Sequence, residues 1–173
     1  MIVYLKQTEK LFLSLNEEYK NSKAAGVLTV VTPTAFVSFL IIRLSCEFEY
    51  YVHDIVIKKW KSETTSTKLH NFLQNKIKIR SSKREQLRNN LKEYFVDIDN
   101  IDILFTDDKG KNYYDKIFGK KKDETGENNI RDQIAHLLSL QFSLLPQWDE
   151  MYDYIQICDN ALQNIEANLD FKM

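Results

Sequence analysis

The hydrophobic positions of this chain recur with the period of an α-helix through most of its length. They predict a first helix over residues 2–22, with its hydrophobic side chains along one stripe. The pair Thr32-Pro33 marks the start of a second helix, because Thr is a favoured N-cap and Pro a favoured first helical residue. This helix is expected to reach about Lys61. Hydrophobic residues nearly encircle it, which is typical of a central, buried helix.

The rest of the chain is predicted to hold shorter helices and one long closing helix. Two of the shorter helices cover residues 65–79 and 82–95, and one or two helical turns fall within residues 110–118. A further helix is expected to start near Thr125. The closing helix is strongly amphipathic, with a hydrophobic face that begins at Trp148.

The composition agrees with a helical globular domain. Hydrophobic residues make up 43% of the 173 residues, which is enough for a core and excludes a disordered chain. Four Gly and two Pro are few for an all-β fold, because such a fold needs many turns. We therefore predict an all-α, up-down helical bundle of about five main helices, in a single domain spanning residues 1–173.

The distribution of charge is more informative than the net charge of −1. Residues 58–93 hold eleven Lys and Arg against three Glu, a net of +8, so the remaining residues carry −9. Such an asymmetry can place one basic face on a nearly neutral protein, and it indicates a polyanionic partner such as RNA. A solvated, lysine-rich helical hairpin is the alternative. The candidate RNA-binding residues are Lys76, Lys78, Arg80, Lys83, Arg84 and Arg88.

The cysteines and the longest hydrophobic segment bear on the cellular setting. Cys46 and Cys158 lie in hydrophobic helical patterns, where cysteine usually behaves as a small buried hydrophobe. No CxxC motif or Cys/His cluster suggests zinc, and we expect neither a metal nor a cofactor. Charged side chains interrupt the hydrophobic segment around residues 35–60, so no membrane span is predicted. With no signal-peptide core at its start, the chain is expected to be cytoplasmic.

The candidate chemistry lies in residues 128–136, which carry Arg131 and His136. RNA can be cleaved without a metal when its 2′-hydroxyl attacks the adjacent phosphorus, giving a 2′,3′-cyclic phosphate and a free 5′-hydroxyl. His136 suits the proton transfer because histidine titrates near neutral pH. Arg131 suits stabilisation of the phosphorane, because its planar guanidinium bonds two phosphate oxygens and keeps its charge. The alternative is structural: a core histidine bonded to a backbone carbonyl, and an arginine in an ion pair, for which Glu47 is a candidate.

The spacing of this pair favours a site shared between two copies of the chain. Residues five apart are about 140° apart on a helix, so Arg131 and His136 do not share one narrow stripe. One protomer then supplies an incomplete cleft, and two copies related by a two-fold axis bring both pairs into one. Glu47 lies among hydrophobic neighbours on the predicted second helix, which favours a cleft or interface position.

The hexapeptide from Arg131 to His136 resembles the Arg-polar-x-x-x-His motif of the HEPN superfamily. Asp132 fits the polar position that follows the arginine. The aromatic-rich run over residues 46–51 resembles the acid-bearing second helix of stand-alone prokaryotic HEPN proteins, and the order of helices is similar over most of the chain. One departure is Leu137-Leu138, where many members have Gly or a polar residue, and it bears on access to the cleft.

The resemblance implies a metal-independent endoribonuclease that acts as a homodimer in toxin–antitoxin or anti-phage defence. Arg131 and His136 match the catalytic residues, Asp132 matches the polar residue after the arginine, and Glu47, or second to it Glu49, matches the acid that orients the pair. The expected partners are RNA, a second copy, and an antitoxin or other defence protein. The alternative is a non-catalytic HEPN-like helical module for protein interaction or RNA binding. A nucleotide-binding helical domain is a third hypothesis.

Overall fold

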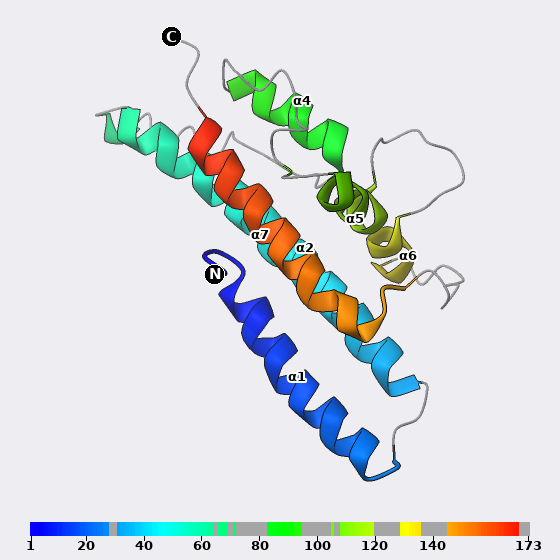
Figure 1. Cartoon of the computed structure of the whole chain (residues 1–173). Coiled ribbons are helices and arrows are strands. Elements are labelled where there is room, and N and C mark those ends of the chain that lie inside the picture. Colours follow the sequence, from blue (N-terminus) through cyan, green and yellow to red (C-terminus); the bar gives the residue numbers. More distant parts are fainter. Residues whose placement is uncertain are drawn as a thin grey trace.

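The structure of the chain is a computed structural model, and every regular element among its described residues is helical. The described residues are 1–27, 31–63, 66–68, 71, 83–94, 105, 108–119, 129–135 and 145–169. The elements are α1 (Lys6–Ala24), α2 (Val31–Glu63), α4 (Arg84–Tyr94), α5 (Asp108–Phe118), α6 (Ile130–Ala135), the 3₁₀ turn η3 (Trp148–Glu150) and α7 (Met151–Asn168). The predicted all-α bundle is confirmed (Figure 1).

The bounds of the helices agree with the sequence pattern in most places. α2 begins at Val31, one residue before the predicted Thr32 cap, a difference usual for helix ends. α5 is longer than the predicted one or two turns, with 11 residues. The helix predicted over residues 65–79 falls almost entirely outside the described residues. The helix start predicted near Thr125 lies outside the described residues, among which α6 begins at Ile130.

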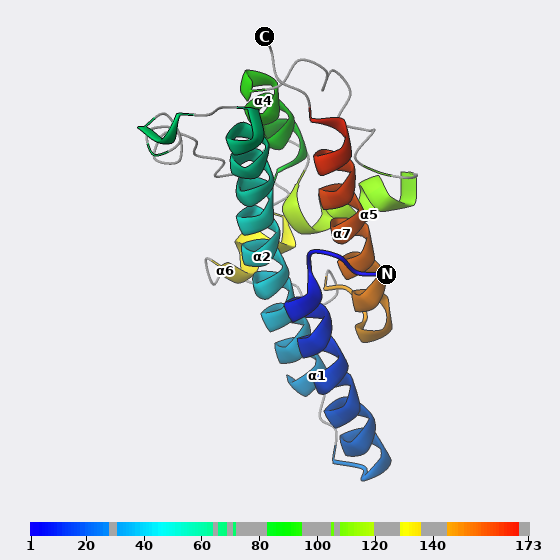
Figure 2. The same cartoon turned by 90° about the vertical axis from the view of Figure 1, so that its left-hand side faces the viewer.

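The three long helices lie side by side, and α1 runs antiparallel to both α2 and α7 (Figures 1 and 2). Tyr152 Oη donates to Glu9 Oε1 at 2.9 Å, and Trp148 Nε1 donates to Asn16 Oδ1 at 2.9 Å. The partners thus come earlier in the C-terminal segment as they come later in α1, so α1 and α7 are antiparallel. α2 and α7 run parallel, and parallel neighbours need a long connection, which here carries α4, α5 and α6. α5 lies across the direction of the long helices (Figure 2).

The start of α1 is held by carboxylates from the two other long helices. The first backbone N–H groups of a helix have no partner within the helix. Asp159 of α7, only 1% exposed, accepts the N–H groups of residues 3–5 at 2.7–2.9 Å, just before α1 begins. Glu47 of α2 accepts both the backbone N–H (3.0 Å) and the hydroxyl of Thr8 in the first turn. Negative charge also suits the positive end of the helix dipole, so these two acids fix α1 to the bundle.

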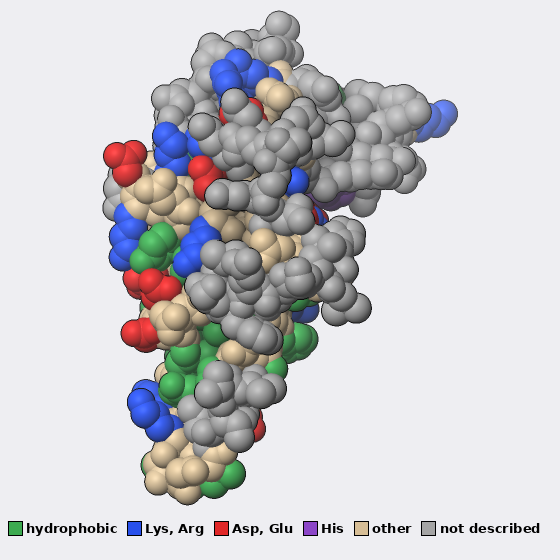
Figure 3. All heavy atoms as spheres, turned by 90° about the vertical axis from the view of Figure 1, so that its right-hand side faces the viewer, with side chains coloured by type: hydrophobic (Ala, Val, Ile, Leu, Met, Phe, Trp, Pro, Cys, Tyr) green, Lys and Arg blue, Asp and Glu red, His purple; other side chains and the backbone are tan. Residues whose placement is uncertain are grey.

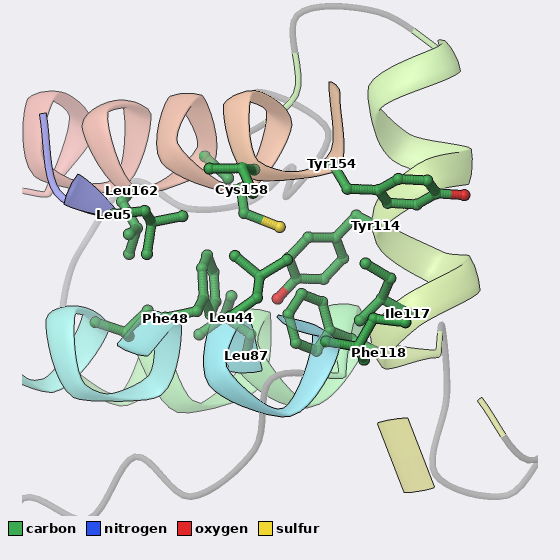
Figure 4. Packing of buried hydrophobic residues seen from close by; sticks show 14 of the residues in the cluster. Leu5, Leu44, Phe48, Leu87, Tyr114, Ile117, Phe118, Tyr154, Cys158 and Leu162 are labelled. Atoms are coloured by element: carbon green, nitrogen blue, oxygen red, sulfur yellow. The ribbon is translucent and has the colours of Figure 1, made fainter. Parts of the chain in front are cut away.

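The core lies where α2, α5 and α7 meet. Tyr114 of α5 is fully buried and inserts between Phe48 of α2 and Cys158 of α7 (Figure 4). Its ring centroid lies 5.5 Å from that of Phe48 and 4.6 Å from that of Phe118. Burial raises the pKa of the Tyr114 hydroxyl, so it stays neutral at physiological pH. This packing holds α5 across the bundle and thereby sets the position of α6, which contacts both α2 and α5.

The two cysteines lie in different environments. Cys158 is buried, as predicted, and burial raises the pKa of its thiol. Cys46 is exposed, so the prediction of a buried position was wrong for it. Of the described helices, α1, α6 and α7 contact α2, and together they leave Cys46 exposed. Among the described helices, none combines the length and the hydrophobicity that a membrane span requires.

Candidate functional site

The start of α6 is built by Asn129. Its Oδ1 accepts the backbone N–H of Asp132 at 2.9 Å, and its Nδ2 donates to Asp132 Oδ2 at 2.9 Å. An Asn that accepts the N–H of the third helical residue is a favoured N-cap, which explains why α6 begins at Ile130. Asn129 packs against Gly119, whose φ of +82° favours glycine and where a Cβ would lie 3.2 Å from Nδ2. The cap fixes Arg131 at the second position of the helix.

Four charged side chains follow one another along the surface at α6. Arg131 Nη2 lies 3.3 Å from Glu49 Oε1 of α2, and Arg131 Nη1 lies 3.2 Å from Asp132 Oδ1. Asp132 Oδ2 lies 3.2 Å from Lys83 Nζ, just before α4. We call Glu49, Arg131, Asp132 and Lys83 the α6 charge cluster. All four are half-buried, so the cluster is formed within the fold but still open to solvent on one side.

The charges of this cluster alternate and sum to zero when all four groups are ionised. Partial burial acts to raise the pKa of Asp132, but the hydrogen bonds from Asn129 and Lys83, together with the positive charges of Lys83 and Arg131, outweigh it. The pKa of Asp132 is therefore lowered, and its carboxylate stays ionised at neutral pH. The guanidinium of Arg131 is held between two carboxylates with its position fixed from two helices.

The predicted RNA-binding residues fall into three groups. Lys83 belongs to the α6 charge cluster. Arg84 is buried at 5% exposure and its Nε lies 2.8 Å from Asp115 Oδ1, while its backbone N–H donates to Gly119 O at 3.0 Å. Arg84 therefore ties the start of α4 to the end of α5. This contact also sets the position of the preceding residue, Lys83. Arg88 is half-buried on α4. Lys76, Lys78 and Arg80 lie outside the described residues.

The acid predicted to orient the arginine lies elsewhere. Glu47 is buried against α1, bonded to Thr8 and 4.0 Å from Arg43, and it makes no described contact with Arg131. The acid that contacts Arg131 is Glu49, two residues further along α2. Two residues are about 200° apart on a helix, so the two acids serve opposite neighbours, α1 and α6. The sequence contains both acids, but it does not say which side of α2 each neighbour covers.

The second half of the predicted catalytic pair, His136, lies outside the described residues, as do Leu137 and Leu138. His136 follows Ala135, the last residue of α6 as the structure describes it. In the described part of the chain, no three His, Cys, Asp or Glu side chains come together as metal ligands.

The surface charge can be followed on one face of the molecule. On the face shown in Figure 3, the coloured Lys and Arg side chains alternate with Asp and Glu, and hydrophobic side chains gather in the lower half. For the described residues in view, positive charge is thus interspersed with negative charge.

A comparison of the chain with protein-family models, curated proteins and solved structures found no match in any of the three.

Proposed function

We propose that this chain is a metal-independent endoribonuclease that acts as a homodimer in a toxin–antitoxin or anti-phage defence system. The observation that carries the proposal is the fixed, half-exposed guanidinium of Arg131, five residues before His136. Two of its five N–H donors face Glu49 and Asp132. In the described part of the chain, these two carboxylates set the direction of the guanidinium before RNA binds, which is what electrostatic catalysis requires.

Each residue then has a distinct role in the proposed cleavage. The 2′-hydroxyl oxygen attacks the adjacent phosphorus and the bond to the 5′-oxygen breaks, giving a 2′,3′-cyclic phosphate and a free 5′-hydroxyl. His136 moves the proton in this step. Arg131 stabilises the charge that develops on the phosphoryl oxygens, with Lys83 as a second cation nearby. Glu49 and Asp132 are positioning residues that hold the guanidinium.

The proposal also assigns the RNA backbone to the basic region between residues 58 and 93. Lys83 lies closest to the site, and the remaining contacts come from Arg88 and from Lys76, Lys78 and Arg80. We leave Arg84 out of this set because its guanidinium is buried on Asp115 and serves the fold.

The test is cleavage of single-stranded RNA by purified protein in the presence of EDTA. The proposal requires products with 2′,3′-cyclic phosphate ends. Arg131→Ala should lower the rate by about 10²–10³, and His136→Ala by about 10²–10⁴, in proteins that keep wild-type helicity. Lys109→Ala removes an exposed cation whose ion pair with Asp153 lies outside the α6 charge cluster, and it should cleave like wild type. Intact RNA with wild-type protein, or cleavage that survives both site substitutions, would refute the nuclease.

The two acids of α2 provide a matched pair for the positioning role. Glu49→Gln keeps the shape of the side chain but removes the charge that faces Arg131, so we expect slower cleavage with unchanged folding. Glu47→Gln acts on the start of α1 and should lower stability while the cleavage rate of the folded protein stays the same. Equal losses of cleavage rate in both variants would contradict the assignment of Glu49.

A non-catalytic helical module is the second candidate, and one observation favours it. Both terminal nitrogens of Arg131 already bond to carboxylates of the protein, as in a structural ion pair that holds α6 to α2. In that case RNA binds and stays intact, and Arg131→Ala lowers stability without any effect on RNA. The cleavage assay, repeated together with an RNA-binding measurement, separates the two functions.

A further inference from the structure

One side of α2 carries a line of exposed and half-buried side chains that includes two aromatic rings. Phe39 is 57% exposed and Tyr50 62% exposed, Cys46 is also exposed, and Ile42 and His53 are half-buried. At 100° per residue these five positions fall within an arc of about 80° on the helix. We call them the α2 stripe.

The stripe lies opposite the part of α2 that enters the core. Leu40, Leu44 and Phe48 are fully buried and lie roughly 120–200° around the helix from the middle of the stripe. Of the described helices, α1, α6 and α7 contact α2: α1 and α7 lie to one side of it in Figure 2, and α6 contacts Glu49, about 60° from the middle of the stripe. Exposed aromatic side chains that share one face of a helix form a hydrophobic patch, which is typical of an interaction surface. Single exposed residues scattered over a surface form no such patch.

The arrangement of the stripe is nearly symmetric about Cys46. Ile42 and Tyr50 lie four residues before and after it, and Phe39 and His53 lie seven residues before and after it. If a second copy packs its own α2 antiparallel across Cys46, each position meets its counterpart: Phe39 meets His53, Ile42 meets Tyr50, and Cys46 meets Cys46. Such self-matching is what a two-fold interface between identical chains requires.

We propose that the α2 stripe is the surface through which two copies of this chain associate, antiparallel, with Cys46 on the two-fold axis. The stripe itself holds no Asp, Glu, Lys or Arg, and its one histidine, His53, comes opposite Phe39 of the second copy. Arg43 on one flank comes opposite the Tyr50 ring of the second copy, a cation–π arrangement.

The exposed aromatic rings supply the hydrophobic centre of the proposed interface. The exposed parts of Phe39 and Tyr50 on both copies amount to roughly 500 Å². A standard interface buries about 1,600 Å² in total, so the four rings form its centre and the flanks of α2 with α6 supply the rest.

This interface has a consequence for the α6 charge cluster, and that part rests on the proposed function. In an antiparallel two-fold pair of helices, the same flank of each helix lies on the same side of the dimer. The flank with Glu49 then brings both Glu49–Arg131 pairs to one side. Their Glu49 residues are separated by six residues along the axis, about 9 Å. A single phosphodiester can then lie between two guanidinium groups, one from each copy.

The test uses the exposed thiol at the proposed axis. Packed helices lie 8–10 Å apart with Cα atoms about 2.3 Å from each axis, so facing Cα atoms lie roughly 3–6 Å apart, a distance that overlaps the range of disulfides. Diamide should therefore oxidise two Cys46 thiols of a dimer to one disulfide, with diamide reduced to its hydrazine. Cys46→Ser should give no cross-link, because Cys158 is buried. Failure of wild-type Cys46 to cross-link would overturn the proposal.

The antiparallel register is tested with two further variants in the Cys46→Ser background. Ile42→Cys mixed with Tyr50→Cys should cross-link, whereas each alone should not, because identical positions would lie about 12 Å apart along the axis. Cross-linking of either variant by itself would contradict the antiparallel arrangement. In sedimentation of reduced protein, Phe39→Asp should shift the dimer to monomer, while Leu13→Asp, an exposed position on α1, should leave it unchanged.

The outcomes for the interface and for the nuclease are separate. Wild-type protein that is monomeric, or a dimer that survives Phe39→Asp, overturns the interface even if RNA is cleaved. Dimers that cross-link through Cys46 but leave RNA intact support the interface and contradict the nuclease.

Discussion

The buried carboxylate of Asp159 holds the segment before α1 through hydrogen bonds to both of its oxygens, and its loss is expected to destabilise the fold. Oδ1 accepts the backbone N–H groups of Tyr4 and Leu5 at 2.7 and 2.9 Å. Oδ2 accepts the N–H of Val3 at 2.9 Å and Nε2 of Gln163 at 2.7 Å. Asp159→Asn keeps the size of the side chain but replaces one of these two acceptors with an NH₂ donor.

The expected loss follows from the four bonds. If the amide oxygen of the variant stays on Tyr4 and Leu5, its NH₂ group faces two other donors, and two bonds to a charged acceptor are lost. Each such bond contributes about 1.5–3 kcal/mol. Val3 is 41% exposed and Gln163 is half-buried, so both groups can turn toward water. The loss should thus lie at the lower end, about 3 kcal/mol.

Urea unfolding followed by circular dichroism measures this loss. With a slope of about 2 kcal/mol per molar urea, the midpoint should fall by about 1.5 M. Asp153→Asn is the matched control on the same helix, because Asp153 makes an exposed ion pair with Lys109 that should contribute little to the free energy of unfolding. A midpoint for Asp159→Asn within about 0.5 M of that control would refute the capping role. Hydrogen exchange should also speed up at residues 3–5 before the rest of α1 opens.

Two further substitutions probe the surroundings of α6. Gly119→Ala should lower the free energy of unfolding by about 2–3 kcal/mol, because a positive φ is strained for Ala and its Cβ would crowd Asn129. Gly26 also has a positive φ, but the space around it is open, so Gly26→Ala should lower this free energy by only about 1 kcal/mol. Urea titration measures both values. Equal losses would contradict the close approach. Asp132 has a lowered pKa in the fold, so its bonds stabilise above the unfolded pKa of about 3.9 and are lost as pH falls through the lowered value. The stability lost in Asp132→Asn should therefore be largest near neutral pH and vanish in acid, and a difference independent of pH would refute this.

The sequence predicts most helices well because their periodicity is local. The hydrophobic stripe of α1 and the hydrophobic face of α7 identify both helices without knowledge of their partners. α2 is the exception, because hydrophobic residues on nearly all sides suggest a helix buried all round. In the structure the described helices leave Phe39, Cys46 and Tyr50 uncovered. The periodicity of a sequence shows which sides of a helix are hydrophobic. It does not show how many neighbouring helices cover those sides.

The charged contacts were less predictable because each depends on a distant part of the chain. Glu47 bonds to Thr8, 39 residues away, and Glu49 bonds to Arg131, 82 residues away. Both acids lie in similar surroundings in the sequence, so only the positions of α1 and α6 decide their partners. The start of α6 did leave a local signal, since Asn129 followed three residues later by Asp132 is a typical capping pair.

The placement of Glu47 and Glu49 on opposite sides of α2 has a consequence for how this helix connects fold and site. Glu47 ties α2 to the start of α1, and Glu49 ties it to Arg131. Three side chains of the α2 stripe, Ile42, Cys46 and His53, lie on the side of Glu49, because each is within about 60° of Glu49 and about 100° or more from Glu47 on the helix. A change at one of these three positions therefore reaches the α6 charge cluster through one turn of helix. The carboxylate that stabilises α1 lies on the other side and should be unaffected. Stability and the proposed RNA chemistry should thus respond independently to substitutions on the two sides of the same helix.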